Sequence, residues 1–563
     1  MVDAVESSEL PPEVAEIQSG YAFAEAAIDI GVLMEDDVPL PSVRVRIPLS
    51  MLNRHGLVAG ATGTGKTKTL QVLTEAISAA GVPVFAADIK GDLSGLAAPG
   101  QAGEKLAART AKIGQDWQPQ ACPVEFYSLG GGDVGVPLRA TVTSFGPILL
   151  SKVLGLNKTQ ESSLGLIFHY ADSAGLPLLD LADLRSVLTY LTGEEGKEEL
   201  KGIGGLSSTT VGVILRSLIT LANQGAEEFF GEPEFDTADL MRTTSDGRGV
   251  VSLLELPSLA SQPALFSTFL MWLLADLFTD LPEVGDVDKP KLVFFFDEAH
   301  LLFNGASEAF LQAITQTVRL IRSKGVGIFF VTQTPKDVPD DVLAQLGSRV
   351  QHQLRAHTPN DAKALKQTVA TFPKSHYDLA ETLQSLGIGE AIVTVMDPDG
   401  APTPVAWTRM LAPQSLMAAI PPDSLRPGIA QSSMMTKYGQ DVDRDSAYEM
   451  LTRKLEAGAQ AAEQECLAQE AARQQAEYDK QQQAAASRAE KERIAAEKQA
   501  ARERAEAERH AARERAEAER QAKAQEREAA RQRKQVTDMV GKVLRSGVAR
   551  DIVRGLFGNA KRR

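Results

Sequence analysis

Residues 60–67 read Gly60-Ala61-Thr62-Gly63-Thr64-Gly65-Lys66-Thr67. This stretch matches the P-loop pattern, in which a glycine-rich turn is followed by lysine and threonine. An apolar run precedes it at residues 57–59 and a helical pattern follows it at 68–80, which is the strand–turn–helix context that the pattern requires. Backbone N–H groups of such a turn surround phosphate oxygens at the start of the helix. The alternative is a glycine- and threonine-rich turn without a ligand, and the flanking elements argue against it.

The pattern also assigns candidate roles to its side chains. We expect Lys66 to reach the β- and γ-phosphates of ATP and the Thr67 hydroxyl to hold Mg²⁺. The candidate nucleotide-binding residues are Gly60, Gly63, Thr64, Gly65, Lys66, Thr67 and Lys68.

Short apolar runs bounded by Gly, Pro or Asp recur along the chain. Continuous apolar character indicates strands that are covered on both faces, and helical patterns lie between several of the runs. This alternation predicts an α/β fold with a mostly parallel sheet flanked by helices. The runs are residues 56–60, 82–88, 124–129, 250–256, 292–297, 326–332 and 391–396.

Composition divides the chain into six segments. From residue 441 Ala, Glu, Arg and Gln dominate, and residues 501–509 recur as 512–520, a spacing of 11. Because alanine is nearly the only apolar residue there, a long solvated helix is favoured over a strong coiled coil. The predicted segments are a leader with a short β segment (1–50, strand 43–47), the first part of the P-loop core (51–138), a mainly helical insertion (139–248), the second part of the core (249–430), a helical or coiled-coil tail (441–535) and a basic amphipathic segment (536–563).

Charge separates the body of the chain from its tail. The formal net charge is −15, from 59 basic and 74 acidic side chains. Residues 451–563 carry 26 basic and 19 acidic side chains, a net charge of +7, so residues 1–450 carry a net charge of −22. An acidic body argues against a protein coated for nucleic-acid binding, although a narrow basic channel inside an assembly stays compatible with it.

Cysteine usage and hydropathy indicate a cytoplasmic protein. The only cysteines, Cys122 and Cys466, lie in dissimilar contexts, so we expect neither a disulfide framework nor a structural zinc site. The first ten residues lack the apolar segment of a signal peptide. The longest apolar stretch, residues 264–278, is too short to span a bilayer, and Asp276 interrupts it. No membrane partner is therefore expected.

A second motif would complete the metal site. Residues 291–300 read KLVFFFDEAH, an apolar strand that ends in two carboxylates. Asp297 fits the Walker B role beside Mg²⁺, and Glu298 fits the base that polarises the attacking water. An ordinary strand capped by acidic residues is the alternative, which the upstream P-loop disfavours. The letters DEAH also occur in DEAH-box helicases, but the arginine-rich signature of that group is missing from the sequence.

Gln333 and several arginines are further candidates. Gln333 follows the run at 326–332, where a polar side chain at a strand's carboxyl end can contact the γ-phosphate or water. Arg319 and Arg322 lie three residues apart on a predicted helix, and either could act as an arginine finger on a neighbouring subunit. Arg349 and Arg355 are rivals for that role.

The sequence leaves the role of Asp88 open and indicates no metal-binding role for the histidines. Asp88, followed by Lys90 and Asp92, could reach the Mg²⁺ shell or could cap the next segment, and the sequence leaves both possibilities open. His352 and His357 show no metal-ligand spacing, so hydrogen-bonded or solvated histidines are expected.

Six blocks carry a resemblance to a known family. They are GATGTGKT (60–67), DIKGDLSGLA (88–97), FGPILLSKVLGLNKTQ (145–160), FFFDEAHLLF (294–303), RLIRSKGVGIFFVTQTPKDVP (319–339) and LGSRVQHQLRAHTP (346–359). Together they resemble the HerA-like ATPases of the HerA–FtsK superfamily, and more narrowly the bacterial group catalogued as domain of unknown function 853. The resemblance implies a RecA-like core, usually a hexameric ring with ATP at the subunit interfaces. It also implies Glu298 as catalytic base, Gln333 as sensor and Arg322 as the best finger candidate.

Two functions are compatible with these features. The first is an ATP-driven homo-hexameric motor that acts on DNA through a central pore, as the resemblance suggests. The second is an ATP-dependent switch or scaffold that remodels a protein partner bound through the C-terminal tail, which the acidic body favours. A nucleotide binder without turnover is a third, simpler alternative.

Overall fold

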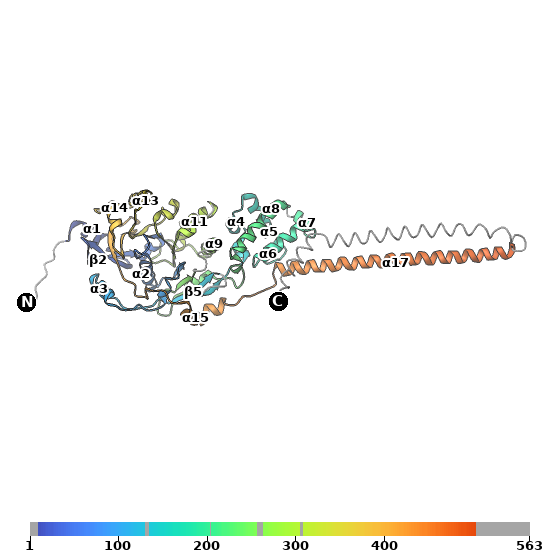
Figure 1. Ribbon diagram of the computed structural model, residues 1–563, viewed down its shortest axis with the longest axis horizontal. Helices are drawn as coiled ribbons and strands as arrows, with labels where there is room; N and C mark the ends of the chain where they lie inside the picture. Colours follow the sequence, from blue (N-terminus) through green and yellow to red (C-terminus); the bar gives the residue numbers. More distant parts are fainter. Residues whose placement is uncertain (1–9, 130–133, 203, 256–262, 304–307, 503–563) are drawn as a thin grey trace, which may run out of the picture. The chain divides into compact units, whose positions relative to one another are not determined.

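The computed structural model describes residues 10–129, 134–202, 204–255, 263–303 and 308–502. Within these ranges one twelve-stranded sheet forms the centre of the fold, in the order β2-β1-β12-β11-β10-β3-β9-β8-β4-β7-β5-β6 (Figure 1). The strands are β1 (Ala27–Glu35), β2 (Val38–Pro48), β3 (Gly56–Ala59), β4 (Val84–Asp88), β5 (Val124–Leu129), β6 (Val136–Leu138), β7 (Val251–Glu255), β8 (Leu292–Phe296), β9 (Val326–Thr332), β10 (Ser348–Gln351), β11 (Glu390–Thr394) and β12 (Ala406–Met410).

The sheet has a parallel part and an antiparallel part. All neighbours from β10 through β3, β9, β8, β4, β7 and β5 to β6 pair in parallel. Strands β2, β1, β12, β11 and β10 pair antiparallel. Every residue of β3, β4, β7, β8 and β9 is buried, as expected for parallel strands covered on both faces. The predicted α/β class with a mostly parallel sheet is confirmed.

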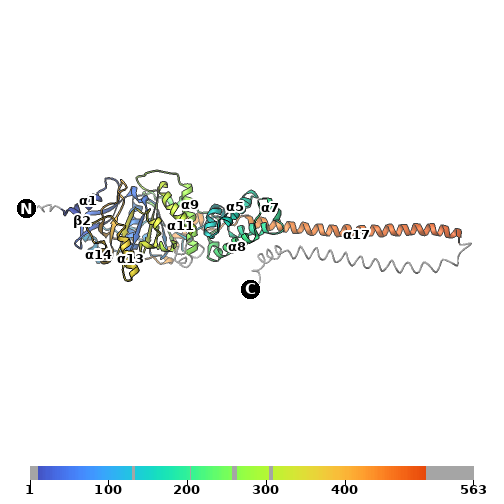
Figure 2. The same ribbon diagram turned by 90° about the horizontal axis from the view of Figure 1, so that it is seen from above.

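Helices connect and cover the strands (Figures 1 and 2). Helix α2 packs against β3 and β4, and α11 packs against α9 and β9. The helical insertion predicted between residues 139 and 248 contains α4 to α8. The helices are α1 (Pro12–Gly20), α2 (Lys66–Ala79), α3 (Glu104–Lys112), α4 (Val142–Val153), α5 (Lys158–Ser173), α6 (Leu181–Thr192), α7 (Lys197–Gly202), α8 (Ser208–Asn223), α9 (Pro263–Asp280), α10 (His300–Phe303), α11 (Glu308–Ile321), α12 (Asp340–Leu343), α13 (Pro359–Val369), α14 (Leu379–Ser385), α15 (Pro422–Ala430), α16 (Ser433–Tyr438) and α17 (Ala447–Arg502).

The N-terminal region contains more structure than its sequence pattern indicates. Besides the strand predicted at 43–47, which is part of the longer β2, it forms α1 and β1. Strand β1 pairs with both β2 and β12, so its position depends on residues almost 380 positions further along the chain. Gly31 is needed at this contact, because a Cβ there would lie 2.4 Å from Thr408 Cγ2. The polar residues within β1 and the four-residue length of β10 hide both strands from a pattern of apolar runs.

Two compact units can be distinguished in the chain. The first comprises residues 1–168, 178–181 and 212–444 and holds the whole sheet; the second comprises 169–177, 182–211 and 445–563. In the second unit, Glu199 accepts hydrogen bonds from Tyr190 and Lys454, at 2.9 Å each, which joins α7 to α6 and α17. The six-segment division made from the sequence stays a prediction.

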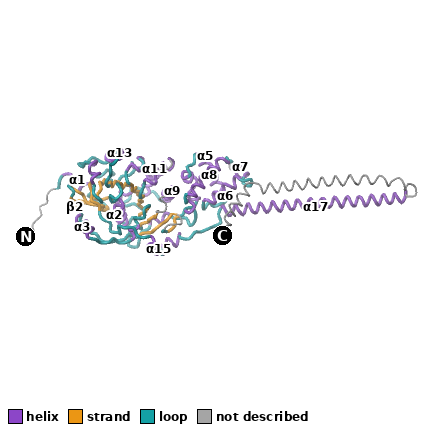
Figure 3. The backbone as a smooth tube through the Cα atoms, viewed as in Figure 1, coloured by secondary structure: helices purple, strands orange, loops and turns teal. Residues whose placement is uncertain are grey.

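The long charged helix expected near the C-terminus is present as α17, a continuous helix in Figure 3. After Leu451 its described side chains are mostly exposed, including Leu467 and Tyr478. The predicted basic segment at 536–563 and nearly all of the 11-residue repeat lie outside the described residues.

Candidate nucleotide and metal site

Strand register brings the sequence motifs to one edge of the sheet. Ala59 of β3 lies opposite Thr332 of β9, so Gly60 and Gln333 begin adjacent loops. Ala87 of β4 likewise lies opposite Phe296 of β8, which places Asp88 beside Asp297. Since these strands are parallel, their carboxyl ends meet at the edge where ligands bind in open α/β sheets.

The P-loop turn connects β3 directly to α2. Gly65 is the N-cap of α2 and has φ 116°, a backbone conformation that a side chain would strain. The first turn of α2 leaves the N–H groups of Lys66 and Thr67 without partners inside the helix, as an anion-binding helix start requires. The Lys66 ammonium donates to the carbonyls of Gly60 (2.6 Å) and Ala61 (3.2 Å). Burial lowers the pKa of Lys66, although the nearby Glu298 charge opposes that shift.

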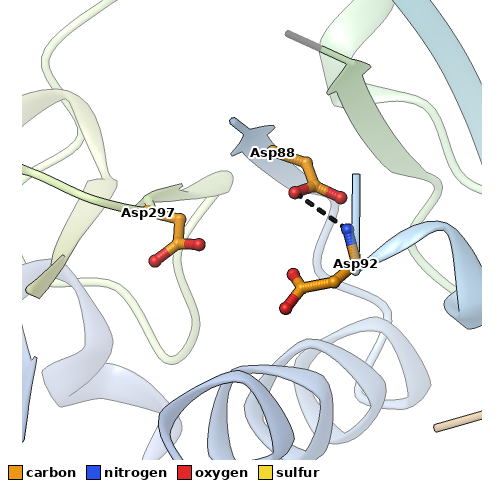
Figure 4. Close-up of side chains that lie close together, drawn as sticks. All are labelled: Asp88, Asp92 and Asp297. Atoms are coloured by element: carbon orange, nitrogen blue, oxygen red, sulfur yellow. Dashed lines mark hydrogen bonds between the residues drawn. The ribbon is translucent and has the colours of Figure 1, made fainter. Parts of the chain in front are cut away.

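Three carboxylates gather next to the P-loop (Figure 4). Oxygen atoms of Asp88, Asp92 and Asp297 lie within 4.8 Å of one another. Burial raises the pKa of Asp297 to about 7, with the charge of Glu298 adding to the effect, and burial raises the pKa of Asp88 to about 6. Thr67 Oγ1 donates to Asp92 Oδ2 (3.2 Å), whereas the buried Asp92 Oδ1 has no hydrogen-bond partner within the described structure. A hard divalent cation such as Mg²⁺ suits this set of oxygen donors.

Asp88 has a structural task that the sequence left open. Its Oδ1 accepts hydrogen bonds from the N–H groups of Lys90 (3.2 Å), Gly91 (2.7 Å) and Asp92 (3.3 Å), and its Oδ2 accepts from that of Leu93 (2.7 Å). Asp88 therefore caps the loop after β4, and this loop carries Lys90 and Asp92 toward the P-loop.

Glu298 stands at the end of β8 among cations. Its carboxylate forms an ion pair with Lys90 and lies 3.1 Å from His300 Nδ1. Burial by itself raises the pKa of Glu298, but Lys90, His300 and Lys66 together lower that pKa below its usual value. The side chain is therefore ionised at neutral pH. Its backbone φ of 48° is rare for a residue with a side chain, and such strain is concentrated at functional sites.

Gln333 and Arg355 lie on the other side of the P-loop. Both line a cavity of about 250 Å³ together with Thr62 and the apolar side chains of Leu354 and Leu365. Arg355 also donates to the Thr62 carbonyl (3.3 Å), so it contacts the P-loop of its own chain. His357 lines the same cavity.

The two cysteines, Cys122 and Cys466, are free thiols and form no disulfide with each other.

The remaining arginine candidates lie away from the P-loop. Arg319, Arg322 and Arg349 line a cavity of about 590 Å³ together with Arg54. Arg54 lies just before β3, and Arg322 lies just before β9, so this cavity is at the amino ends of the strands whose carboxyl ends carry the P-loop. The structure thus does not bring Arg322 to the nucleotide site of its own chain. Burial and the neighbouring Arg54 lower the pKa of Arg322.

His352 connects the P-loop helix to the antiparallel strands. It follows Gln351, which lies opposite Ala59 in β10 and β3. Its Nδ1 lies 2.8 Å from the Glu390 carbonyl, and its Nε2 lies 2.9 Å from Thr69 Oγ1. A neutral ring that donates from Nδ1 and accepts at Nε2 satisfies both contacts. His352 is therefore a hydrogen-bonded structural histidine, and only tertiary contacts reveal that it supports the P-loop.

The sequence pattern indicates no role for Lys90 or His300. The signals were present, since Lys90 lies in the stretch Asp88–Asp92 and His300 ends the DEAH letters. Their closeness to Glu298 depends on the pairing of β4 with β8.

No helix in the described ranges combines the length and apolar character needed to span a bilayer.

The sequence of this chain is similar to those of known helicases. A family model described as "Helicase HerA-like C-terminal" matches residues 35–563. The DNA double-strand break repair helicase HerA of Sulfurisphaera tokodaii is 23% identical over 376 residues, which cover 66% of this chain and 67% of that protein. The protein of the same name from Pyrococcus furiosus is 22% identical over 432 residues, covering 69% and 73%. Among solved structures, the bacterial conjugative coupling protein TrwB aligns with a TM-score of 0.47 and 14% identity, over 72% of this chain and 95% of that one.

Proposed function

Because this chain belongs to the helicase HerA-like C-terminal family, we propose that it is an ATP-driven ring motor that translocates on DNA. The chain is a P-loop ATPase that uses ATP and Mg²⁺. The observation that carries the proposal is the convergence of Lys66, Thr67, Asp297 and Glu298 at one sheet edge.

The site residues divide the work of hydrolysis. The N–H groups of the P-loop and Lys66 would bind the phosphates, once the Lys66 ammonium leaves the Gly60 and Ala61 carbonyls. Thr67 and Asp297 would hold Mg²⁺, and Asp92 lies close enough to contribute. ATP held there would supply the γ-phosphoryl group, which would pass to water as its bond to the β-phosphate oxygen breaks and ADP leaves, and Mg²⁺ would neutralise the charge on the phosphates. Glu298, which is ionised, would orient that water and accept its proton.

The position of the arginine-lined cavity is compatible with an assembly in which subunits form a ring. Arg322 lies at the edge of the sheet opposite the P-loop, so it cannot stabilise charge on the nucleotide of its own chain. In a ring of head-to-tail subunits, one such edge can face the next P-loop, where an arginine would act in trans. We propose a homo-hexamer, the assembly that the resemblance to the HerA-like ATPases implies, with Arg322 as the finger and Gln333 as the sensor. The unpaired cysteines favour action in the cytoplasm.

Charge limits where DNA can bind. Residues 1–450 carry a net charge of −22, so contact with DNA is expected at a local pore surface or the tail rather than over the exterior. The same acidic body favours a second candidate function, in which ATP hydrolysis remodels a protein partner held by the tail.

DNA dependence of hydrolysis separates the two functions. ATP turnover is measured at low salt without DNA, with single-stranded DNA and with double-stranded DNA, alongside the mass of the assembly with and without nucleotide. If the chain is a DNA motor, DNA should stimulate ATP turnover, and the measured mass should be that of several subunits assembled in a ring. Glu298→Gln is the control, because it should bind ATP but lose turnover at least about 100-fold. Turnover that no DNA stimulates would favour the protein-remodelling function.

A further inference from the structure

The start of the P-loop is held between the carboxyl ends of two strands. On one side, the Gly60 N–H donates to the carbonyl of Thr332, the last residue of β9 (3.2 Å). On the other side, the Ala61 N–H donates to the carbonyl of Gln353, two residues beyond the end of β10 (2.8 Å). The segments that follow β9 and β10 are therefore both fixed beside the first residues of the loop.

Each of these segments brings one polar side chain to the same cavity. Gln333, which follows β9, and Arg355, which lies two residues beyond Gln353, both line the cavity of about 250 Å³. Ala61 and Thr62 of the P-loop form part of its wall. Arg355 Nη2 donates to the Thr62 carbonyl (3.3 Å), so the guanidinium is already in contact with the loop.

Two cations bond to consecutive carbonyl groups at the start of the loop. The Lys66 ammonium donates to the carbonyls of Gly60 and Ala61, and Arg355 donates to the next one, that of Thr62. Lys66 has to exchange its carbonyls for phosphate oxygens when ATP binds. The same exchange favours Arg355, because hydrogen bonds between a guanidinium and a phosphate are shorter and stronger than those to a neutral carbonyl.

Arg355 is free to make this exchange. Within the described ranges the Thr62 carbonyl is the only hydrogen-bond partner of its guanidinium, and the side chain is exposed. Asp361 lines the same cavity, but its Oδ2 accepts from the Thr358 N–H (3.0 Å) in the capping box of α13. A phosphate would therefore meet a guanidinium that no carboxylate holds.

The strand order places Arg355 on the side of the P-loop that lacks carboxylates. Asp297 and Glu298 follow β8, which is separated from β3 by β9, whereas Arg355 follows β10 on the other side of β3. The γ-phosphate must contact the Lys66 ammonium, which now lies against Ala61 in the wall of the cavity. The terminal phosphate thus lies between the metal-binding carboxylates and Arg355.

We propose that Arg355 binds the γ-phosphate of the ATP held by its own P-loop. This assignment rests on the proposed ATPase function and adds to it a cation that acts in cis, whereas Arg322 is proposed to act in trans. The guanidinium would leave the Thr62 carbonyl and donate to γ-phosphate oxygens. Because ADP lacks this phosphate, the contact distinguishes ATP from ADP. The same charge stabilises the γ-phosphoryl group as it passes to water.

Affinities for ATP and ADP test this role. They are measured with Mg²⁺ on the full chain carrying Glu298→Gln, which prevents turnover. Arg355→Ala, Arg355→Lys and the matched control Arg46→Ala are made in this parent. Arg46 is a half-buried arginine of β2 that pairs with Asp29 (3.1 Å), and four strands lie between β2 and β3.

Arg355→Ala should bind ATP at least about tenfold more weakly than the parent, because a charged hydrogen bond is lost, and should bind ADP equally well. Arg355→Lys should recover part of the loss, since it restores the charge without the guanidinium fork. Arg46→Ala should match the parent. Unchanged ATP affinity in Arg355→Ala would overturn the assignment, as would an equal loss for both nucleotides, which indicates a deformed P-loop. A parent that binds neither nucleotide would instead overturn the proposed ATPase function, and the role of Arg355 with it.

Mixed assemblies distinguish action in cis from action in trans. Arg355→Ala and Lys66→Ala chains, both with Glu298 intact, carry different affinity tags, and assemblies that contain both chains are isolated through the two tags. If Arg355 acts in cis, every site lacks one of the two cations, so turnover should stay as low as in the separate variants. Recovered turnover would refute the assignment, because the arginine would then come from a neighbour. A chain that does not assemble has no neighbour, and its loss of ATP affinity is in cis.

Discussion

Acid should weaken the protein through His352, the buried histidine that supports the P-loop. Its ring is completely buried, and burial lowers its pKa from 6.5 to about 4. Between these values the unfolded chain binds a proton that the folded chain does not. The stability contributed by the neutral ring is therefore complete above pH 6.5 and is lost as the pH falls toward 4.

The size of the effect follows from the shift. A shift of this size corresponds to roughly 3 kcal/mol in full, of which about 2 kcal/mol is already lost at pH 5. Replacing His352 with Gln removes the titrating group but leaves an amide that can still bond to Thr69 or Glu390. At pH 8 the variant should be less stable by about 1 kcal/mol, the value of one hydrogen bond. Its further loss between pH 8 and pH 5 should be smaller than that of the wild type by about 2 kcal/mol.

Urea unfolding of the nucleotide-free chain at pH 8 and pH 5 measures this difference. His55 offers a matched control, since it is equally buried, has its pKa lowered to about 4 and lies at the amino end of β3. His55→Gln should reduce the pH dependence by the same amount, but only His352→Gln should also weaken ATP binding. Equal losses of stability between the two pH values in the wild type and His352→Gln would refute the reasoning.

Three other substitutions probe the site. Lys66→Ala should abolish ATP hydrolysis, and turnover like that of the wild type would contradict the P-loop assignment. Lys90→Gln should raise the pKa of Glu298 because its ion pair is lost, so turnover should fall at pH 6 relative to pH 8; a pH profile that stays in place would exclude this role. Gly60→Ala should lower the thermal midpoint and the affinity for ATP, because the added Cβ would lie 2.5 Å from His352 Cβ; an unchanged midpoint would show that β10 can move aside.

The local sequence pattern was sufficient to predict most strands of the parallel part and the two motifs. The strands concerned are β3, β4, β5, β7, β8 and β9. Each run of apolar residues from 56–60 to 326–332 became a strand of the parallel part, because burial on both faces leaves a continuous apolar signature. Strands β1, β6, β10 and β12 were missed. Strand β1 contains polar residues, β6 and β10 have only three and four residues, and β12 alternates between buried and half-buried side chains.

By itself, the sequence determined that a P-loop and a strand ending in two carboxylates exist, because short-range geometry and strand burial impose both patterns. Only the tertiary structure decided what stands around them. Register between β4 and β8 placed Lys90 against Glu298, and the loop before β11 placed the Gly389 N–H against the Thr64 carbonyl, more than 300 residues away in the chain. The structure likewise put Arg322 at the sheet edge opposite the P-loop. Such contacts arise from packing between distant segments, and no local preference of the residues concerned encodes them.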